Sequence, residues 1–175
     1  QSDRDQMKPL GFPRAAAAPV FANGEVFHLP LDAESIVGFD RSSGKPGTSL
    51  AKRALQLDVW DGRLIASVGE SIVEIDPATR TSRDLLTVGD ETLRMTIGDG
   101  LLCLVNGARV PVLTRYDLRA ACVLESTPVG AYDLDSALLP HDGRIVLAGS
   151  RVAICERAEV YKQAESTLDD GKRRA

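Results

Sequence analysis

The two histidines are the first candidates for acid–base or metal chemistry in this chain. His28 lies in the run EVFHLPL, and His141 stands beside a turn in LPHDG. Neither has a carboxylate or a cysteine at the spacing of a metal-binding pair. A Ser-His-Asp triad does not need neighbouring residues, but no Gly-x-Ser-x-Gly motif supplies a nucleophile. We therefore predict no catalytic residue and no metal site, and we interpret His141 as a solvated turn residue.

Three carboxylates, Glu70, Glu74 and Asp76, lie close together in the sequence. Glu74 and Asp76 are two residues apart, which places them on one face of a strand, and paired carboxylates can perform acid–base catalysis. However, Asp40 and Asp117 end similar apolar runs in other parts of the chain. A catalytic residue is needed once, whereas a structural residue recurs with its repeat. The recurrence favours a structural role for Asp76 at the start of a turn.

The three cysteines, Cys103, Cys122 and Cys155, each lie in an apolar, strand-like run. Their odd number and the lack of a Cys-x-x-Cys pair argue against a disulfide framework or a zinc site. We predict that all three are small buried residues that stay reduced, which is typical of a cytoplasmic protein. The sequence indicates no cofactor.

A two-residue turn signal recurs along the chain at intervals of about 40 residues. The four pairs are Asn23-Gly24, Asp61-Gly62, Asp99-Gly100 and Asp142-Gly143. Asn-Gly and Asp-Gly favour the type I′ turn of a β-hairpin, because both central residues need a positive φ. Each pair therefore predicts a tight antiparallel hairpin.

Apolar runs surround each turn in the same order. The second turn is followed by two apolar runs, RLIASVG and SIVEID, and similar pairs of runs follow the other three turns. Before the second turn, over residues 55–60, leucine and valine residues alternate with Gln56, Asp58 and Trp60. This alternation predicts that Gln56, Asp58 and Trp60 face outward. Polar outer strands such as TSRDLL complete the unit. Each interval thus predicts four strands, the size of one propeller blade.

This repeat resembles the blades of the β-propeller superfamily, in its WD-repeat-like and quinoprotein-like variants. The resemblance covers residues 19–157 and identifies no subfamily, because the Gly-His and Trp-Asp pairs of WD repeats and the tryptophan-docking motif of quinoproteins are absent. The predicted fold is all-β, with four tandem four-stranded antiparallel β-meander repeats that form a propeller or part of one. An ordinary β-sandwich is the rival architecture. Because an unclosed stack of blades leaves an exposed edge, the ring closes on itself or is completed by another segment or chain.

The expected organisation has three parts. Residues 1–18 form an N-terminal extension, and residues 158–175 form a short helical tail, because apolar residues in RAEVYKQAESTLDD follow helical spacing. The repeats between them divide at about 19–53, 54–91, 92–130 and 131–157.

Composition narrows the function without naming it. The net charge of −4 argues against a nucleic-acid surface, and no apolar run reaches the roughly 18 residues of a membrane span. We predict a non-catalytic protein–protein interaction scaffold, or a subunit of a larger complex, that binds a protein partner through its loops or an open edge strand. The candidate binding residues lie at the turns: Asn23, Asp61, Asp99, His141 and Asp142. The alternative is an enzyme or small-ligand-binding propeller with its site in the central funnel.

Overall fold

The computed structural model describes residues 18–30, 35–50, 52–107, 110–129, 137–141, 144–148 and 152–155. All the regular secondary structure in these ranges is β-strand, and the strands form four antiparallel sheets in sequence order. We call these sheets blades 1 to 4. The helix predicted for residues 158–175 lies outside the described ranges. No helix that is long and apolar enough to cross a membrane occurs in the ranges that are described.

Each blade is a meander in which every strand pairs with the next one along the chain. Blade 1 contains β1 (Val20–Ala22), β2 (Glu25–His28), β3 (Ile36–Asp40) and β4 (Pro46–Leu50). Blade 2 contains β5 (Gln56–Trp60), β6 (Arg63–Val68), β7 (Ser71–Asp76) and β8 (Thr81–Thr87). Blade 3 contains β9 (Thr92–Gly98), β10 (Leu101–Asn106), β11 (Val112–Asp117) and β12 (Cys122–Pro128). Blade 4 contains β13 (Ala137–His141), β14 (Arg144–Ala148) and β15 (Val152–Cys155). The predicted all-β meander repeats are confirmed, with three strands described in the fourth sheet.

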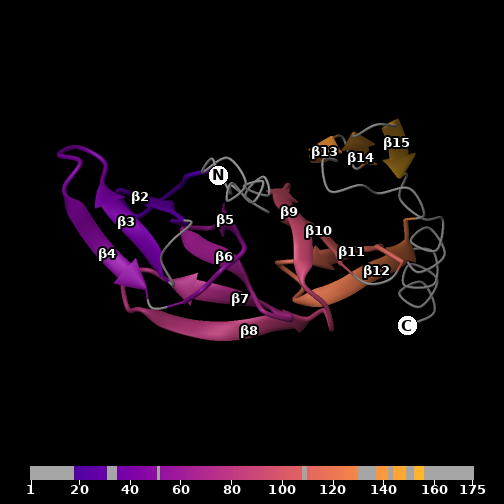
Figure 1. Ribbon diagram of the computed structural model, residues 1–175, viewed down its shortest axis with the longest axis horizontal. Coiled ribbons are helices and arrows are strands. Elements are labelled where there is room, and N and C mark those ends of the chain that lie inside the picture. Colours follow the sequence, from indigo (N-terminus) through magenta and orange to yellow (C-terminus); the bar gives the residue numbers. More distant parts are fainter. Residues whose placement is uncertain are drawn as a thin grey trace, which may run out of the picture.

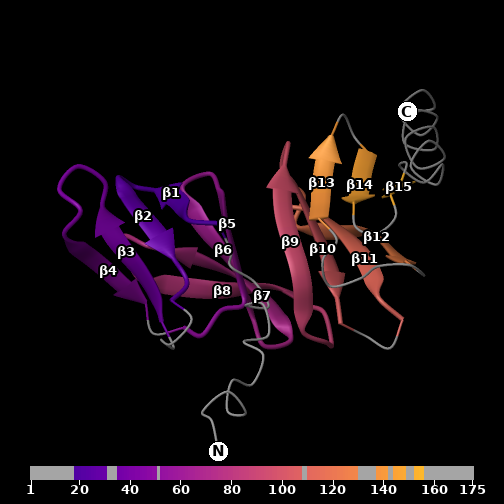
Figure 2. The same cartoon turned by 45° about the horizontal axis from the view of Figure 1, so that its top comes forward.

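The blades follow one another along an arc, from β4 at one end to β15 at the other (Figure 1). The first strand of each blade lies on the inner side, so that β5 contacts both β1 and β9, and β9 contacts β13 (Figure 2). Successive sheets therefore pack face against face, as propeller blades do.

The hairpin turns have the geometry that the sequence predicts. Asn23, Asp61 and Asp99 have φ values of 48°, 48° and 54°, and the glycine after each also has a positive φ. In blade 4, His141 pairs with Arg144 across the two residues between them. Asp142 and Gly143 themselves lie outside the described residues.

Three hydrophobic clusters hold the blades together, one at each successive junction. Phe27 and Leu64 belong to the cluster between blades 1 and 2, and Ile65 and Leu102 to the one between blades 2 and 3. The cluster between blades 3 and 4 contains Ile145. Blades 2 and 3 each contribute to two of these clusters, so both faces of their sheets are buried.

Burial of both faces corrects the expectation that Gln56 and Asp58 point to solvent. Gln56 is buried, and its Nε2 donates to the carbonyl of Leu93 in blade 3 at 3.3 Å. Asp58 Oδ2 accepts from the Ile97 amide of blade 3 at 2.8 Å. Burial raises the pKa of Asp58, although its bonds to the Val59 and Ile97 amides act in the opposite direction. The alternation marks two different packing surfaces, not a core face and a solvent face.

The prediction of three buried cysteines is wrong for Cys122, which is exposed on the outer strand β12. Cys103 is buried between blades 3 and 4, and burial raises the pKa of its thiol to about 12. The thiol of Cys103 is therefore protonated at neutral pH and is a poor nucleophile.

The aspartates that end the third strands cap the following turns. Asp76 Oδ1 accepts from the amides of Ala78 and Thr79, and Asp117 Oδ1 from those of Arg119 and Ala120. Asp40 does the same for the turn after β3. The structural interpretation of these recurring carboxylates is confirmed.

The Asp40 cap supports a prediction that titration can check. The hydroxyls and amides of Ser42 and Ser43 all donate to Asp40 Oδ1, and these bonds lower its pKa from 3.8 to about 2, with the Ser42 hydroxyl as the largest cause. We expect the Ser42→Ala, Ser43→Ala variant to raise the Asp40 pKa toward 3.8 in an NMR titration. Because the folded-state pKa is depressed, the cap stabilises the fold above about pH 4, and that contribution is lost as the pH falls through about 2. An unchanged pKa in the variant would contradict this account.

Candidate functional site

The described turns of blades 1 to 3 lie next to one another on one rim of the molecule. A Cβ added to Gly62 would lie 3.4 Å from Asn23 Oδ1, which places the first turn against the second. A Cβ added to Gly100 would lie 3.0 Å from Trp60 Cη2, which places the third turn against the end of β5. The repeat therefore gathers residues from separate blades along this rim.

A groove opens on this rim at the junction of blades 2 and 3. Its volume is about 570 Å³. The lining residues are Trp60, Asp61, Arg63, Glu74, Arg83, Leu118 and Arg119. A smaller hollow of about 110 Å³ shares Arg63, Glu74 and Arg83 and continues along blade 2 toward β8. We call the larger cavity the blade 2–3 groove.

Strand register places the blade 2 side chains of the groove on one face. Trp60 and Arg63 are paired across the second turn, and Glu74 is paired with Arg83 across β7 and β8. Paired residues of antiparallel strands project from the same face. Ile65 packs toward blade 3, pairs with Glu74 and is two residues from Arg63, so all four side chains point toward blade 3. Two of them, Trp60 and Arg63, directly flank the Asp61-Gly62 turn.

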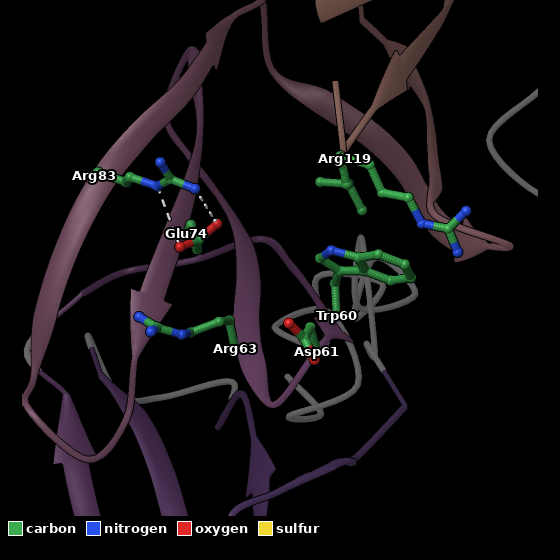
Figure 3. Close-up of a pocket in the computed structure, with 7 residues that line it drawn as sticks. Trp60, Asp61, Arg63, Glu74, Arg83 and Arg119 are labelled. Carbon is green, nitrogen blue, oxygen red and sulfur yellow. Dashed lines mark hydrogen bonds and ion pairs between the residues drawn. The ribbon is translucent and has the colours of Figure 1, made fainter. Parts of the chain in front are cut away.

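Blade 3 contributes Arg119 through a turn that is held from two sides. Asp117 Oδ1 accepts from the Arg119 amide at 2.8 Å, and the Leu118 amide donates to the Gly100 carbonyl at 3.0 Å. These bonds fix the backbone of the turn, and the Arg119 guanidinium lies over the Trp60 ring, with its carbon 5.4 Å from the ring centroid (Figure 3). This is the distance of a cation–π contact.

Ion pairs hold the other two guanidinium groups. Arg83 donates two bonds to Glu74, at 3.2 and 2.8 Å, and Glu74 raises the pKa of Arg83 (Figure 3). Arg63 Nη1 lies 3.0 Å from Asp76 Oδ2. The pKa of Asp76 is lowered, first by the Thr79 amide and to a smaller extent by Arg63. Among the described residues, Arg119 is the groove's one guanidinium without a carboxylate partner.

The groove contains one of the residues predicted as binding candidates, Asp61. Asn23 and Asp99 lie at neighbouring turns but do not line it, and nothing is described of the His141 side chain or of Asp142. Sequence reasoning missed Trp60, Arg63 and Arg119. The available signal was their position, since all three lie within two residues of a turn or of a capping aspartate.

The described residues include no group of three histidine, cysteine or acidic side chains that could hold a metal ion. Two carboxylates line the groove, and one of them, Glu74, already accepts from Arg83. The arrangement is therefore suited to holding a polar, negatively charged group against an aromatic surface.

Comparison with known proteins identifies the fold but no family. No family model matches the sequence, and no curated protein gives a significant sequence match. The computationally designed Ika4 protein matches with a TM-score of 0.61 and 13% identity, over 81% of this chain and 91% of that chain. A chain of the mitotic checkpoint complex matches with a TM-score of 0.64 and 13% identity, over 82% of this chain and 47% of its own length.

Hydrazine synthase from Kuenenia stuttgartiensis matches with a TM-score of 0.58 and 11% identity, over 78% of this chain and 52% of that chain. This chain thus spans about half of the two natural chains. The fold is propeller-like. At these identities the matches carry information on the fold alone.

Proposed function

We propose that this chain is a non-catalytic protein-interaction module that binds an acidic segment of a partner protein in the blade 2–3 groove. The observation that carries the proposal is the Trp60–Arg119 pair, an aromatic ring and an unmatched guanidinium held together at a rigid rim. Tryptophan and arginine are enriched among the residues that contribute most to binding at protein interfaces. The mitotic checkpoint complex shows that a chain with a similar fold takes part in a protein complex.

Charge and exposure indicate the chemistry of the partner. Arg119 is exposed, and a partner carboxylate placed beside it would form an ion pair without displacing an existing one. Arg63 and Arg83 already have carboxylate partners that offset their charges, so Arg119 supplies the attraction for an acidic group. An apolar side chain next to that carboxylate would pack on the partly exposed ring of Trp60. We therefore expect binding of short segments in which an acidic residue neighbours an apolar one.

The test is a selection of random peptides displayed on phage against the full chain, followed by fluorescence anisotropy with the enriched peptides. Enriched peptides should contain Asp or Glu beside an apolar residue, and their affinity should fall as salt concentration rises. Trp60→Ala should weaken binding by about 30-fold, which corresponds to about 2 kcal/mol. Arg119→Glu should abolish it, because repulsion replaces attraction.

Arg80→Ala is the matched control, since Arg80 is exposed on blade 2 but lies outside the groove. It should bind like the unmodified chain. Arg119 is also exposed, so the Arg119→Glu variant is expected to fold normally. Peptides that bind this variant as tightly as the parent chain would refute the groove as the binding site. A selection that enriches no acidic sequence would do the same.

The alternative, a site in the central funnel, gains no support from the described inner strands. Asp58 is the inner-strand carboxylate with a raised pKa, but its two oxygens already accept from the Val59 and Ile97 amides. Asp58 therefore joins blades 2 and 3 and is not available to a ligand.

A further inference from the structure

Equivalent positions in the four blades show which face of each sheet meets a neighbour. The second residue of each blade's second strand points toward the preceding blade, and the third points toward the following blade. In blade 2 these residues are Leu64, which belongs to the cluster with blade 1, and Ile65, which belongs to the cluster with blade 3. The same positions can therefore be compared in all four blades.

The residues at these positions are fully buried except at the two ends of the arc. Among residues that face a preceding blade, Leu64, Leu102 and Ile145 are 0% exposed, whereas Val26 of blade 1 is partly exposed. The residues that face a following blade show the same contrast: Phe27, Ile65 and Cys103 are 0% exposed, and Val146 of blade 4 is partly exposed. Among the described residues, no neighbour covers the face of blade 1 that points away from blade 2 (the backward face) or the face of blade 4 that points away from blade 3 (the forward face).

The inner strands give the same result with larger exposures. Phe21 of β1 is 60% exposed, although its equivalents Val59 and Ile97 pack in the clusters toward the preceding blade. Leu139 of β13 is 51% exposed, although its equivalent Asp58 bonds to the next blade. Large apolar side chains thus occupy contact positions that have no neighbour among the described residues.

The open backward face extends across blade 1. Strand register aligns Phe21 with Val26, and Val26 with Phe39, so the three side chains share one face. The His28 ring stacks on Phe39 at 5.4 Å between centroids, and the Arg41 guanidinium lies over Phe21 at 5.9 Å. This is an aromatic and aliphatic surface of the kind that the internal junctions bury.

We propose that two copies of this chain close one propeller ring, with blade 4 of each copy packed against blade 1 of the other. In Figure 1 blades 1 and 4 lie at opposite ends of the arc. The backward face and the forward face are the two complementary halves of the interface that the chain already makes three times. A second copy supplies the missing half at both ends, so the assembly closes and leaves neither face exposed.

The Asp58–Ile97 bond indicates which residues would meet. It joins the equivalents of Leu139 and Phe21 across the junction of blades 2 and 3. By the same register, Leu139 of one copy lies beside Phe21 of the other. Two such junctions form in the dimer, and each strengthens the other because the second forms within one complex.

Sedimentation equilibrium of the full chain at micromolar concentration is the first experiment. The mass should be that of two chains. Val26→Glu and Leu139→Glu should each shift it to the mass of one chain, because a carboxylate would be buried at both junctions. Val123→Glu is the matched control: Val123 is 46% exposed on the outer strand β12, away from the end faces, and this variant should stay dimeric. Denaturation curves verify that each variant is folded.

Cysteine cross-linking tests the orientation in a Cys122→Ser, Cys155→Ser background, which removes the exposed thiol of Cys122 and keeps Cys103, which is buried. Tagged Phe21→Cys chains mixed with untagged Leu139→Cys chains should form a disulfide-linked pair, whereas Phe21→Cys chains alone should not. A monomer at every concentration, a mass other than two chains, or cross-linking between identical variants would overturn the proposal. Because Phe21 and Leu139 lie outside the blade 2–3 groove, peptide binding can fail without affecting this result, and the reverse also holds.

Discussion

Replacement of Ile65 by alanine is expected to lower the free energy of unfolding by about 2–5 kcal/mol. Ile65 is fully buried at the junction of blades 2 and 3, where it packs with Leu102 and Tyr116. Its truncation leaves a cavity between two packed blades, and the surrounding side chains can collapse into it only partly. This loss is a large share of the 5–15 kcal/mol or so by which a typical domain is stable.

Urea unfolding followed by tryptophan fluorescence measures this change well. Trp60 is the only tryptophan and packs against the same cluster, so its emission reports on the junction and on the groove together. Val123→Ala on the exposed outer strand is the control and should change stability by less than about 0.5 kcal/mol. If Ile65→Ala cost no more than this control, the blades would not be joined through Ile65 as described.

The repeat could be predicted from the sequence because it depends on local physics. A type I′ turn needs two residues with positive φ, so Asn23-Gly24 and its equivalents identify hairpins without any tertiary information. Asp76 and Asp117 cap turns through amides two and three residues away, which is also a local pattern. These elements recur in each blade, and recurrence in the sequence made them visible.

Contacts between blades could not be predicted in the same way. Asp58 and Ile97 are 39 residues apart, and only the stacking of one sheet on another brings the carboxylate to the amide. For the same reason Gln56 was expected in solvent although it is buried. Alternating polar residues show that the two faces of a strand have different surroundings. They do not show whether the polar face contacts water or a neighbouring blade.

The blade 2–3 groove contains one residue that the sequence predicted and others that it could not predict. Asp61 was predicted because it belongs to a turn, and the turn does place it at the rim. Arg119 and Trp60 come from different blades, and their contact depends on how the third turn packs against the second. A site assembled between repeats leaves no spacing signal within one repeat.

The Arg115–Glu125 pair supports the second prediction of a large effect. The Arg115 side chain is only 4% exposed, and its Nη1 lies 3.3 Å from Glu125 Oε2, on a carboxylate that is 25% exposed. Glu125 also accepts from the Thr127 hydroxyl at 2.6 Å. We expect Glu125→Ala to lower the free energy of unfolding by about 3 kcal/mol, because it takes a carboxylate away from a buried guanidinium. Urea unfolding measures the loss.

The double variant Arg115→Met, Glu125→Leu separates the energy of the pair from the energy of burying the charge. Replacing both partners by apolar residues removes the desolvation penalty together with the ion pair, so we expect less than half the loss seen for Glu125→Ala. The loss in the single variant should also change little with salt, since the guanidinium is shielded from solvent. Equal losses for the single and double variants would show that side-chain packing, and not the burial of the Arg115 charge, determines the cost.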